Sequence, residues 1–183
     1  MCFMTEQDVT PQSTRRQALW WALAASALAA GCASRPDRRS AHATGGGMPT
    51  AGALQLNGDL RESLFARTML VVNTPYTYGG NSPKGGFDCS GLIQWAVSGI
   101  TRTRLPRTTA QWARASSPVG KSDLQRGDFV FFNTLGGRYS HMGIFIGNGQ
   151  FVHAPSSGGT VQRVRLDNVY FAKRFTEARS IFA

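Results

Sequence analysis

Three side chains of this sequence have the chemistry of a nucleophile and its base: Cys89, His141 and His153. A thiol becomes a nucleophile once its proton is removed, and imidazole is the side chain that exchanges a proton most readily near neutral pH. The set therefore predicts nucleophilic catalysis in which one His acts as the base for Cys89 and the other orients that base.

The residues after Cys89 predict a short helix, from Cys89 to Val97, that Gly99 ends. A thiol at a helix N-terminus faces unpaired backbone N–H groups and the positive end of the helix dipole. We expect this position to favour the thiolate and to lower the thiol pKa from about 8.5 into the range of roughly 3.5 to 7.5. The stretch from Tyr76 to Phe87 is rich in Gly, which would let a substrate backbone approach the sulfur closely.

The two histidines fall on predicted strands, Met142 to Ile146 and Gln150 to Ala154, that a strong hairpin turn at Gly147-Asn148-Gly149 joins. His141 begins the first strand, and His153 lies near the end of the second. Pairing around that turn would bring both rings to the same open end of the hairpin, where they could touch.

Other interpretations of these residues exist. A lone Cys is often an inert, buried small hydrophobe, and a His is often an ordinary core or surface residue. Cys89, His141 and His153 could also hold zinc, but the paired short spacings of zinc sites are absent. We therefore expect no metal and no cofactor.

The surrounding pattern predicts an α+β fold. Asp59 and Glu62 have the spacing of a capping box before an apolar helical pattern that reaches Val72, and a further helix is predicted near Thr108 to Ala115. After Pro118 the pattern changes to short β-rich runs, which include 129–132, 160–166 and 179–182.

The N-terminal residues 1–31 are typical of an export signal, with Arg15-Arg16 ahead of a short apolar run. The run ends in Leu28-Ala29-Ala30-Gly31-Cys32, which resembles a bacterial lipoprotein signal, so Cys32 is the predicted lipidation site. The Arg pair fits twin-arginine and general export equally well. Residues 32–56 are predicted to be a flexible tether, and residues 57–183 the catalytic domain.

The chain is strongly basic, with 20 Lys and Arg against 10 Asp and Glu. This charge suits an anionic partner such as a membrane surface or a cell wall. No nucleic-acid motif is present and the Arg residues are scattered, so we expect no nucleic-acid partner.

Six ordered segments together resemble the NlpC-type cell-wall peptidase family, and most of all its lipoprotein endopeptidases of the Spr kind. The segments are Pro75-Tyr76-Thr77-Tyr78-Gly79-Gly80, Asp88-Cys89-Ser90-Gly91-Leu92, Leu105-Pro106-Arg107-Thr108, Gly127-Asp128-Phe129-Val130-Phe131-Phe132, Ser140-His141-Met142-Gly143-Ile144-Phe145-Ile146-Gly147 and Phe151-Val152-His153-Ala154. One departure is the stretch from Tyr76 to Cys89, which is one residue longer than in the Spr kind.

The resemblance implies a papain-like α+β domain whose nucleophile stands at the start of a helix. It implies Cys89 as the nucleophile, His141 as the general base and acid, and His153 as the residue that orients His141. Tyr76 would lie near the nucleophile and, with Asp88 and Ser90, would help to bind substrate. For Asp88 the alternative is a helix cap.

The implied reaction is hydrolysis of an amide bond in a peptidoglycan stem peptide, at D-glutamate, diaminopimelate or D-alanine, through a Cys acyl-enzyme. An amidase or acyltransferase on the same scaffold and a non-catalytic envelope-binding module are the alternatives. Ala33 after the lipidated Cys resembles sorting to the outer membrane, which predicts a lipoprotein that faces the periplasm.

Overall fold

The computed structural model describes residues 53–156 and 158–183. The predicted export signal, Cys32 and most of the predicted tether lie outside the described residues. The elements are η1 (Gly58–Leu60), α1 (Arg61–Leu70), β1 (Asn81–Ser82), β2 (Gly86–Phe87), α2 (Cys89–Ser98), α3 (Thr109–Arg114), β3 (Ser117–Val119), η2 (Lys121–Asp123), β4 (Phe129–Phe132), β5 (His141–Gly147), β6 (Gln150–His153), β7 (Gln162–Arg165), α4 (Val169–Ala172) and β8 (Phe175–Ser180). Helices come first and a sheet follows, so the α+β prediction is confirmed.

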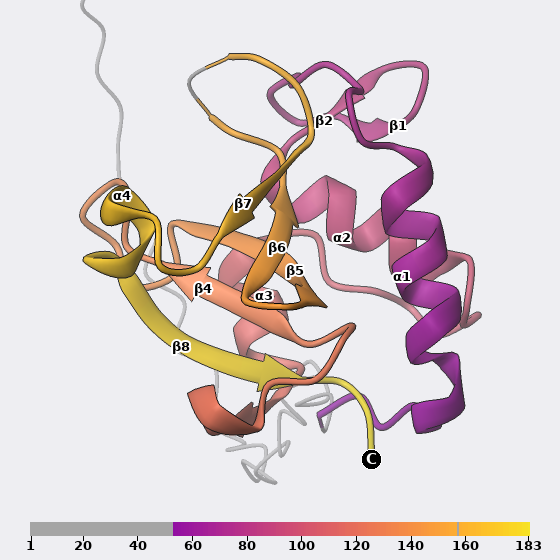
Figure 1. Cartoon of the computed structure of the whole chain (residues 1–183). Helices are drawn as coiled ribbons and strands as arrows, with labels where there is room; N and C mark the ends of the chain where they lie inside the picture. Colours follow the sequence, from indigo (N-terminus) through magenta and orange to yellow (C-terminus); the bar gives the residue numbers. More distant parts are fainter. Residues whose placement is uncertain (1–52, 157) are drawn as a thin grey trace, which may run out of the picture. The chain divides into compact units, whose positions relative to one another are not determined.

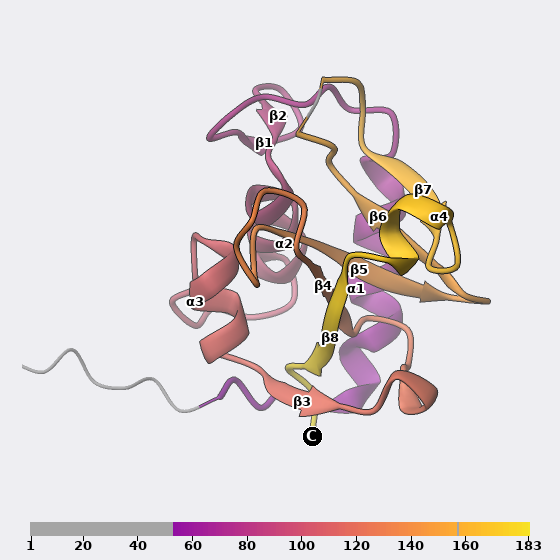
Figure 2. The same cartoon turned by 90° about the vertical axis from the view of Figure 1, so that its left-hand side faces the viewer.

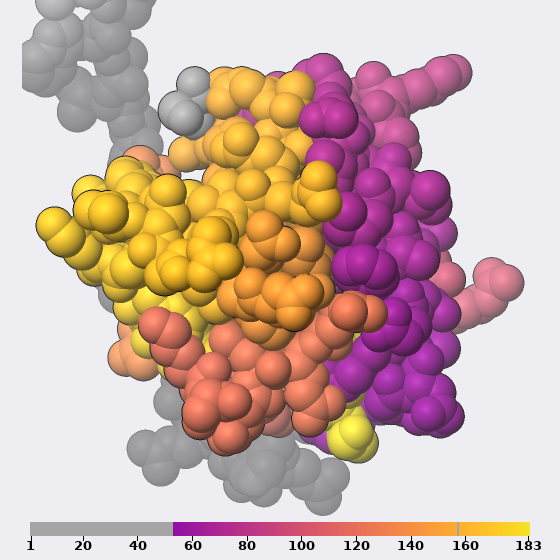
Figure 3. All heavy atoms as spheres, in the orientation of Figure 1, coloured from indigo at the N-terminus to yellow at the C-terminus, as the bar shows by residue number. Residues whose placement is uncertain are grey.

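The main sheet has six antiparallel strands in the order β3-β8-β4-β5-β6-β7. The two longer helices, α1 and α2, lie side by side next to this sheet (Figure 1). A view from the side shows α3 next to α2 (Figure 2), and in the space-filling view the indigo surface that includes α1 forms the right-hand side of the molecule (Figure 3).

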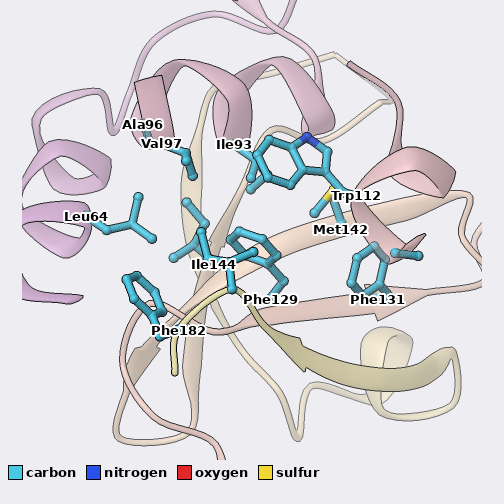
Figure 4. Packing of buried hydrophobic residues seen from close by; sticks show 12 residues of the cluster. Leu64, Ile93, Ala96, Val97, Trp112, Phe129, Phe131, Met142, Ile144 and Phe182 are labelled. Carbon is cyan, nitrogen blue, oxygen red and sulfur yellow. The ribbon is translucent and has the colours of Figure 1, made fainter. Parts of the chain in front are cut away.

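The core between α2 and the sheet is built from large apolar side chains that are almost completely buried (Figure 4). It includes Leu64, Ile93, Ala96, Val97, Trp112, Phe129, Phe131, Met142, Ile144 and Phe182. Burial of one such large side chain contributes about 1.5–3 kcal/mol, so this cluster fixes the position of α2 on the sheet.

The opposite face of the sheet carries a second cluster, made of Val130, Phe132, Phe145, Phe151, Leu166 and Phe171. Side chains alternate along a strand, so β5 directs Met142 and Ile144 towards α2 and His141 and Phe145 to the other face. His141, at the start of β5, thus lies on the face opposite α2, and its neighbour Met142 lies on the face towards α2.

Several local predictions need correction. The first helix begins at Arg61, after a 3₁₀ turn that Asn57 caps, and Glu62 binds Arg126 rather than closing a capping box at Asp59. The chain before this turn is also part of the fold, because the Leu56 N–H donates to the Ile181 carbonyl and Leu54 packs on the core. The domain therefore begins before residue 57.

Three glycines near Cys89, namely Gly80, Gly86 and Gly91, allow the chain to pack closely against itself. A Cβ on Gly91 would lie 2.0 Å from the Gly80 carbonyl oxygen, and one on Gly80 would lie 2.5 Å from the Gly86 oxygen. The same Gly80 oxygen accepts the Asp88 N–H at 3.0 Å. This close approach seats the start of α2 against the preceding loop.

Gly91→Ala should therefore destabilise the fold by about 1–3 kcal/mol, because backbone rather than a flexible side chain must move. Urea unfolding measures this difference. Gly58→Ala is the control, since its Cβ would meet the nearest atom at an ordinary 3.7 Å. Equal stability of the two variants would contradict the close approach.

Candidate active site

Cys89 is the first residue of α2, as the sequence predicts. Asp88 caps this helix, and its carboxylate accepts the Gly91 N–H at 2.6 Å. The backbone N–H groups of Met142, Ser90 and Cys89 itself lie near the sulfur and act to lower the pKa of the thiol. The sulfur thus lies at the helix N-terminus and against the backbone of β5.

The expected lowering of the thiol pKa is wrong for the protein without substrate. Burial, together with the neighbouring Asp88 carboxylate, raises the pKa of Cys89 to about 11. The three backbone N–H groups act in the opposite direction but do not outweigh burial. The free protein therefore carries a neutral thiol at neutral pH.

The two histidines meet as predicted. The Nε2 atom of His141 lies 2.9 Å from Nδ1 of His153, and both side chains are buried among Phe132, Phe151 and Phe171. The second ring nitrogen of His153, Nε2, lies 3.5 Å from the amide of Gln162 on β7, a neighbour that the sequence did not predict. This chain of contacts fixes the plane of both rings.

Burial keeps both rings neutral. It lowers the pKa of His141 to about 4, and burial together with the His141 charge lowers the pKa of His153 to about 3. A neutral imidazole can accept a proton, so the arrangement suits a general base.

The same burial predicts a loss of stability in acid. The unfolded chain binds protons at its histidines below pH 6.5, whereas the folded rings stay neutral down to about pH 4, so stability falls as the pH falls. We expect a loss of about 2 kcal/mol for each histidine between pH 7 and pH 5, measured by urea unfolding at both values. His141→Gln should remove the part of this pH dependence of stability that His141 contributes. An unchanged dependence would contradict the burial of a neutral ring.

Cys89 lies near His141 because its sulfur contacts the backbone of β5, not because the two side chains are hydrogen-bonded. Within the described residues, no hydrogen bond joins the sulfur to either ring, and the Met142 N–H, which contacts the sulfur, belongs to the residue after His141. Contacts between nucleophile and base are often long before substrate binds. The Nδ1 atom of His141 is the ring nitrogen that the His153 contact leaves for Cys89.

An open pocket of about 270 Å³ lies over the two histidines. Its walls come from the loop after β4, the end of β6, β7 and α4, and they include Thr134, Pro155, Gln162, Tyr170 and Phe171. The pocket gives a substrate group access to the His side of the site.

The three predicted substrate-binding residues lie beside Cys89. Burial and the nearby Cys89 and Asp88 raise the pKa of Tyr76, so its phenol keeps its proton and can donate it. Ser90 is buried, and its hydroxyl donates to Asp88 at 3.1 Å. The structure thus shows the cap role of Asp88, while substrate binding by these residues stays a prediction.

Within residues 53–156 and 158–183, no three His, Cys, Asp or Glu side chains gather closely enough to hold a metal ion.

Comparisons with known proteins place this geometry in a family. The NlpC/P60 family model matches residues 73–180. Murein DD-endopeptidase MepH of Escherichia coli (strain K12) is 37% identical over 118 residues, which cover 63% of this chain and 44% of MepH. The probable endopeptidase NlpC of the same organism is 44% identical over 109 residues, which cover 59% of this chain and 70% of that protein.

A solved structure of a lipoprotein-like NLP/P60 family protein from Staphylococcus aureus subsp. aureus Mu50 superposes with a TM-score of 0.62 and 25% identity, over 72% of this chain and 44% of that one. The α+β, papain-like fold expected from the sequence is therefore confirmed. Cys89, His141 and His153 all fall within the matched residues 73–180. Because the match covers more than half of the chain, the protein belongs to the NlpC/P60 family.

Proposed function

We propose that this protein is a peptidoglycan endopeptidase that hydrolyses stem-peptide amide bonds through a Cys89 acyl-enzyme. The observation that carries the proposal is the buried contact between His141 and His153 beside a thiol at the start of α2. The names of the relatives support the substrate, since MepH is a murein DD-endopeptidase. The net charge of +10 also suits an anionic cell wall.

The contact between the rings restricts the tautomer that can work. For His141 to accept the thiol proton at Nδ1, its own Nε2 must carry a hydrogen and donate it to Nδ1 of His153. His153 then carries its hydrogen on Nε2, which the Gln162 carboxamide accepts when its oxygen, rather than its NH₂ group, faces the ring. In this arrangement His153 fixes both the orientation and the tautomer of the base.

The reaction then runs through acylation and hydrolysis, each with two proton transfers at the same nitrogen. Nδ1 of His141 takes the Cys89 proton while the sulfur bonds to the amide carbon, and it gives that proton to the nitrogen of the leaving amine as the C–N bond breaks. Water next loses a proton to His141 and attacks the thioester, which releases the acid and returns the thiol. The backbone N–H groups at the start of α2 would stabilise the oxyanion.

Because both resting groups are neutral, the thiolate forms as the substrate arrives rather than beforehand. The thiol gives its proton to His141 only when a substrate displaces water from the site and brings its carbonyl carbon to the sulfur. This differs from a permanent thiolate–imidazolium pair, and it protects the sulfur from chance oxidation.

Hydrolysis in ¹⁸O water tests this proposal against its alternatives. Defined crosslinked muropeptides and single stem peptides are incubated with the protein, and the products are analysed by mass spectrometry. A hydrolase places one ¹⁸O atom in the new carboxylate, whereas an acyltransferase gives an unlabelled product joined to an amine. Bound but uncleaved muropeptide would favour the binding module.

We further propose that Cys32 carries lipid and holds the protein at the outer membrane, facing the periplasm. The lipoprotein-like residues before Cys32 and the Ala33 that follows it support this location. No helix within the described residues is both long enough and apolar enough to cross a bilayer.

Cys32→Ser should move the protein from the membrane fraction to the soluble fraction, because acylation supplies about 0.8 kcal/mol per buried CH₂. Fractionation with immunoblotting measures the change, and activity towards soluble stem peptides should stay the same. A mature chain whose mass shows an unmodified Cys32 would contradict the anchor but not the catalytic assignment.

A further inference from the structure

Arg107 connects the loop before α3 to the two residues that flank the nucleophile. Its Nη1 and Nη2 atoms donate to the two oxygens of Asp88 at 3.0 and 2.6 Å, which is the two-point geometry of a strong Arg–carboxylate pair. Nη1 also donates to the Ser90 hydroxyl at 3.0 Å. A single guanidinium thus holds the residue before Cys89 and the residue after it.

Both oxygens of the Asp88 carboxylate are occupied by hydrogen bonds. Besides Arg107, its oxygens accept the N–H groups of Gly91 and Gly79 and the Ser90 hydroxyl. Burial alone would raise the pKa of Asp88, but the hydrogen bonds from Arg107 and Gly91 and the Arg107 charge hold it below its usual range. Asp88 is therefore ionised, and its negative charge lies one residue from the sulfur that must become negative.

The charged and titratable groups around the sulfur come from four parts of the chain. Asp88 precedes it as the N-cap residue of α2, Tyr76 approaches from the loop before β1, and His141 lies at the start of β5. Tyr76 and His141 are neutral at neutral pH, as their pKa values show. The fourth group, Arg107, is the cation of this set; its hydrogen bond to Asp88 raises its pKa most, and the Asp88 and Cys89 charges add to this effect.

We propose, building on the peptidase assignment, that Arg107 is a positioning residue: it clamps Asp88 and Ser90 on either side of Cys89 and cancels the Asp88 charge, so that the sulfur faces no net negative charge. Arg suits this role because its planar fork binds both carboxylate oxygens and keeps its charge at every accessible pH. Asp88 can then cap α2 without opposing the thiolate. Through Arg107, the loop before α3 thereby controls the reactivity of Cys89 at the start of α2.

The rate of Cys89 alkylation by iodoacetamide at pH 8 measures this effect directly, read in the full chain by mass spectrometry of the Cys89 peptide. Below the thiol pKa this rate follows the thiolate fraction. Arg107→Gln removes the positive charge and should slow alkylation by roughly three- to tenfold. Arg104→Gln is the matched control, because Arg104 is exposed on the same loop, and its rate should stay within about twofold of the wild type.

A second substitution separates charge from structural damage. Asp88→Asn removes the opposing charge and keeps a good helix cap, so the double variant Asp88→Asn/Arg107→Gln should return to within about twofold of the wild-type rate. An Arg107→Gln rate equal to the wild type, or a double variant no faster than Arg107→Gln, would overturn the proposal.

Thermal unfolding of each variant accompanies these rates. If Arg107→Gln does not fold, Asp88→Asn alone tests the proposal. This variant removes the negative charge that the Arg107 charge cancels, so it should speed alkylation of Cys89 by roughly three- to tenfold. An unchanged or slower rate in Asp88→Asn would overturn the proposal. Alkylation needs no substrate, so a chain with the expected rates but no hydrolysis would refute the peptidase assignment and not the role of Arg107.

Discussion

Cys89→Ala should abolish the release of new amino groups from peptidoglycan, with a loss of more than about 10³-fold in rate. In the proposed mechanism the sulfur forms the bond to the substrate carbon, and Ala offers no nucleophile in its place. The substitution removes one atom at the start of α2 and leaves the Asp88 cap intact, so the helix should remain. A fluorescent assay for free amines measures the rate.

Ser98→Ala, at the exposed end of the same helix, is the matched control and should keep wild-type activity. Thermal unfolding of both variants should lie within a few degrees of the wild type. Activity near the wild-type level in folded Cys89→Ala would refute the acyl-enzyme mechanism.

The two histidines should differ in how much activity their loss removes. His141→Ala removes the proposed general base, and we expect a loss of about 10²- to 10⁴-fold in kcat. His153→Asn should cost less, about tenfold, because the Asn oxygen can still accept the Nε2 hydrogen of His141. Steady-state kinetics on one soluble muropeptide compare the variants.

His153→Ala is the informative third variant, because it leaves the buried Nε2 hydrogen of His141 without an acceptor. Its activity should fall below that of His153→Asn. If His141→Ala were the milder change, the base and the orienting residue would have to exchange roles.

Local signals predicted the parts of the site that neighbouring residues determine. The Asp88 cap and the apolar pattern after Cys89 place this residue at the start of α2. The Asn148-Gly149 turn, in which both residues have positive φ, sets the hairpin register that joins the two histidines. A helix cap and a two-residue turn need no distant partner, so a single sequence carries them.

The features that the sequence did not predict depend on contacts between distant segments. The raised pKa of Cys89 follows from burial, which the packing of α2 on the sheet decides, and the pairing of Arg107 with Asp88 spans 19 residues. Helix α4 has only four residues, too few for a periodic pattern, although its Phe171 covers both histidine rings. The sequence assigns Leu54 and Leu56 to the tether because the carbonyl groups that accept their N–H groups belong to residues 115 and 181, far along the chain.

Digestion of purified, crosslinked peptidoglycan by the wild-type protein, with mass spectrometry of the released fragments, tests the central claim most directly. The proposed mechanism predicts fragments cut at an amide bond within the stem peptide, with a new carboxylate on one side of each cut and a new amine on the other, and no such fragments from Cys89→Ala. Intact peptidoglycan after incubation with folded wild-type protein, or fragments cut in the glycan strand, would contradict it.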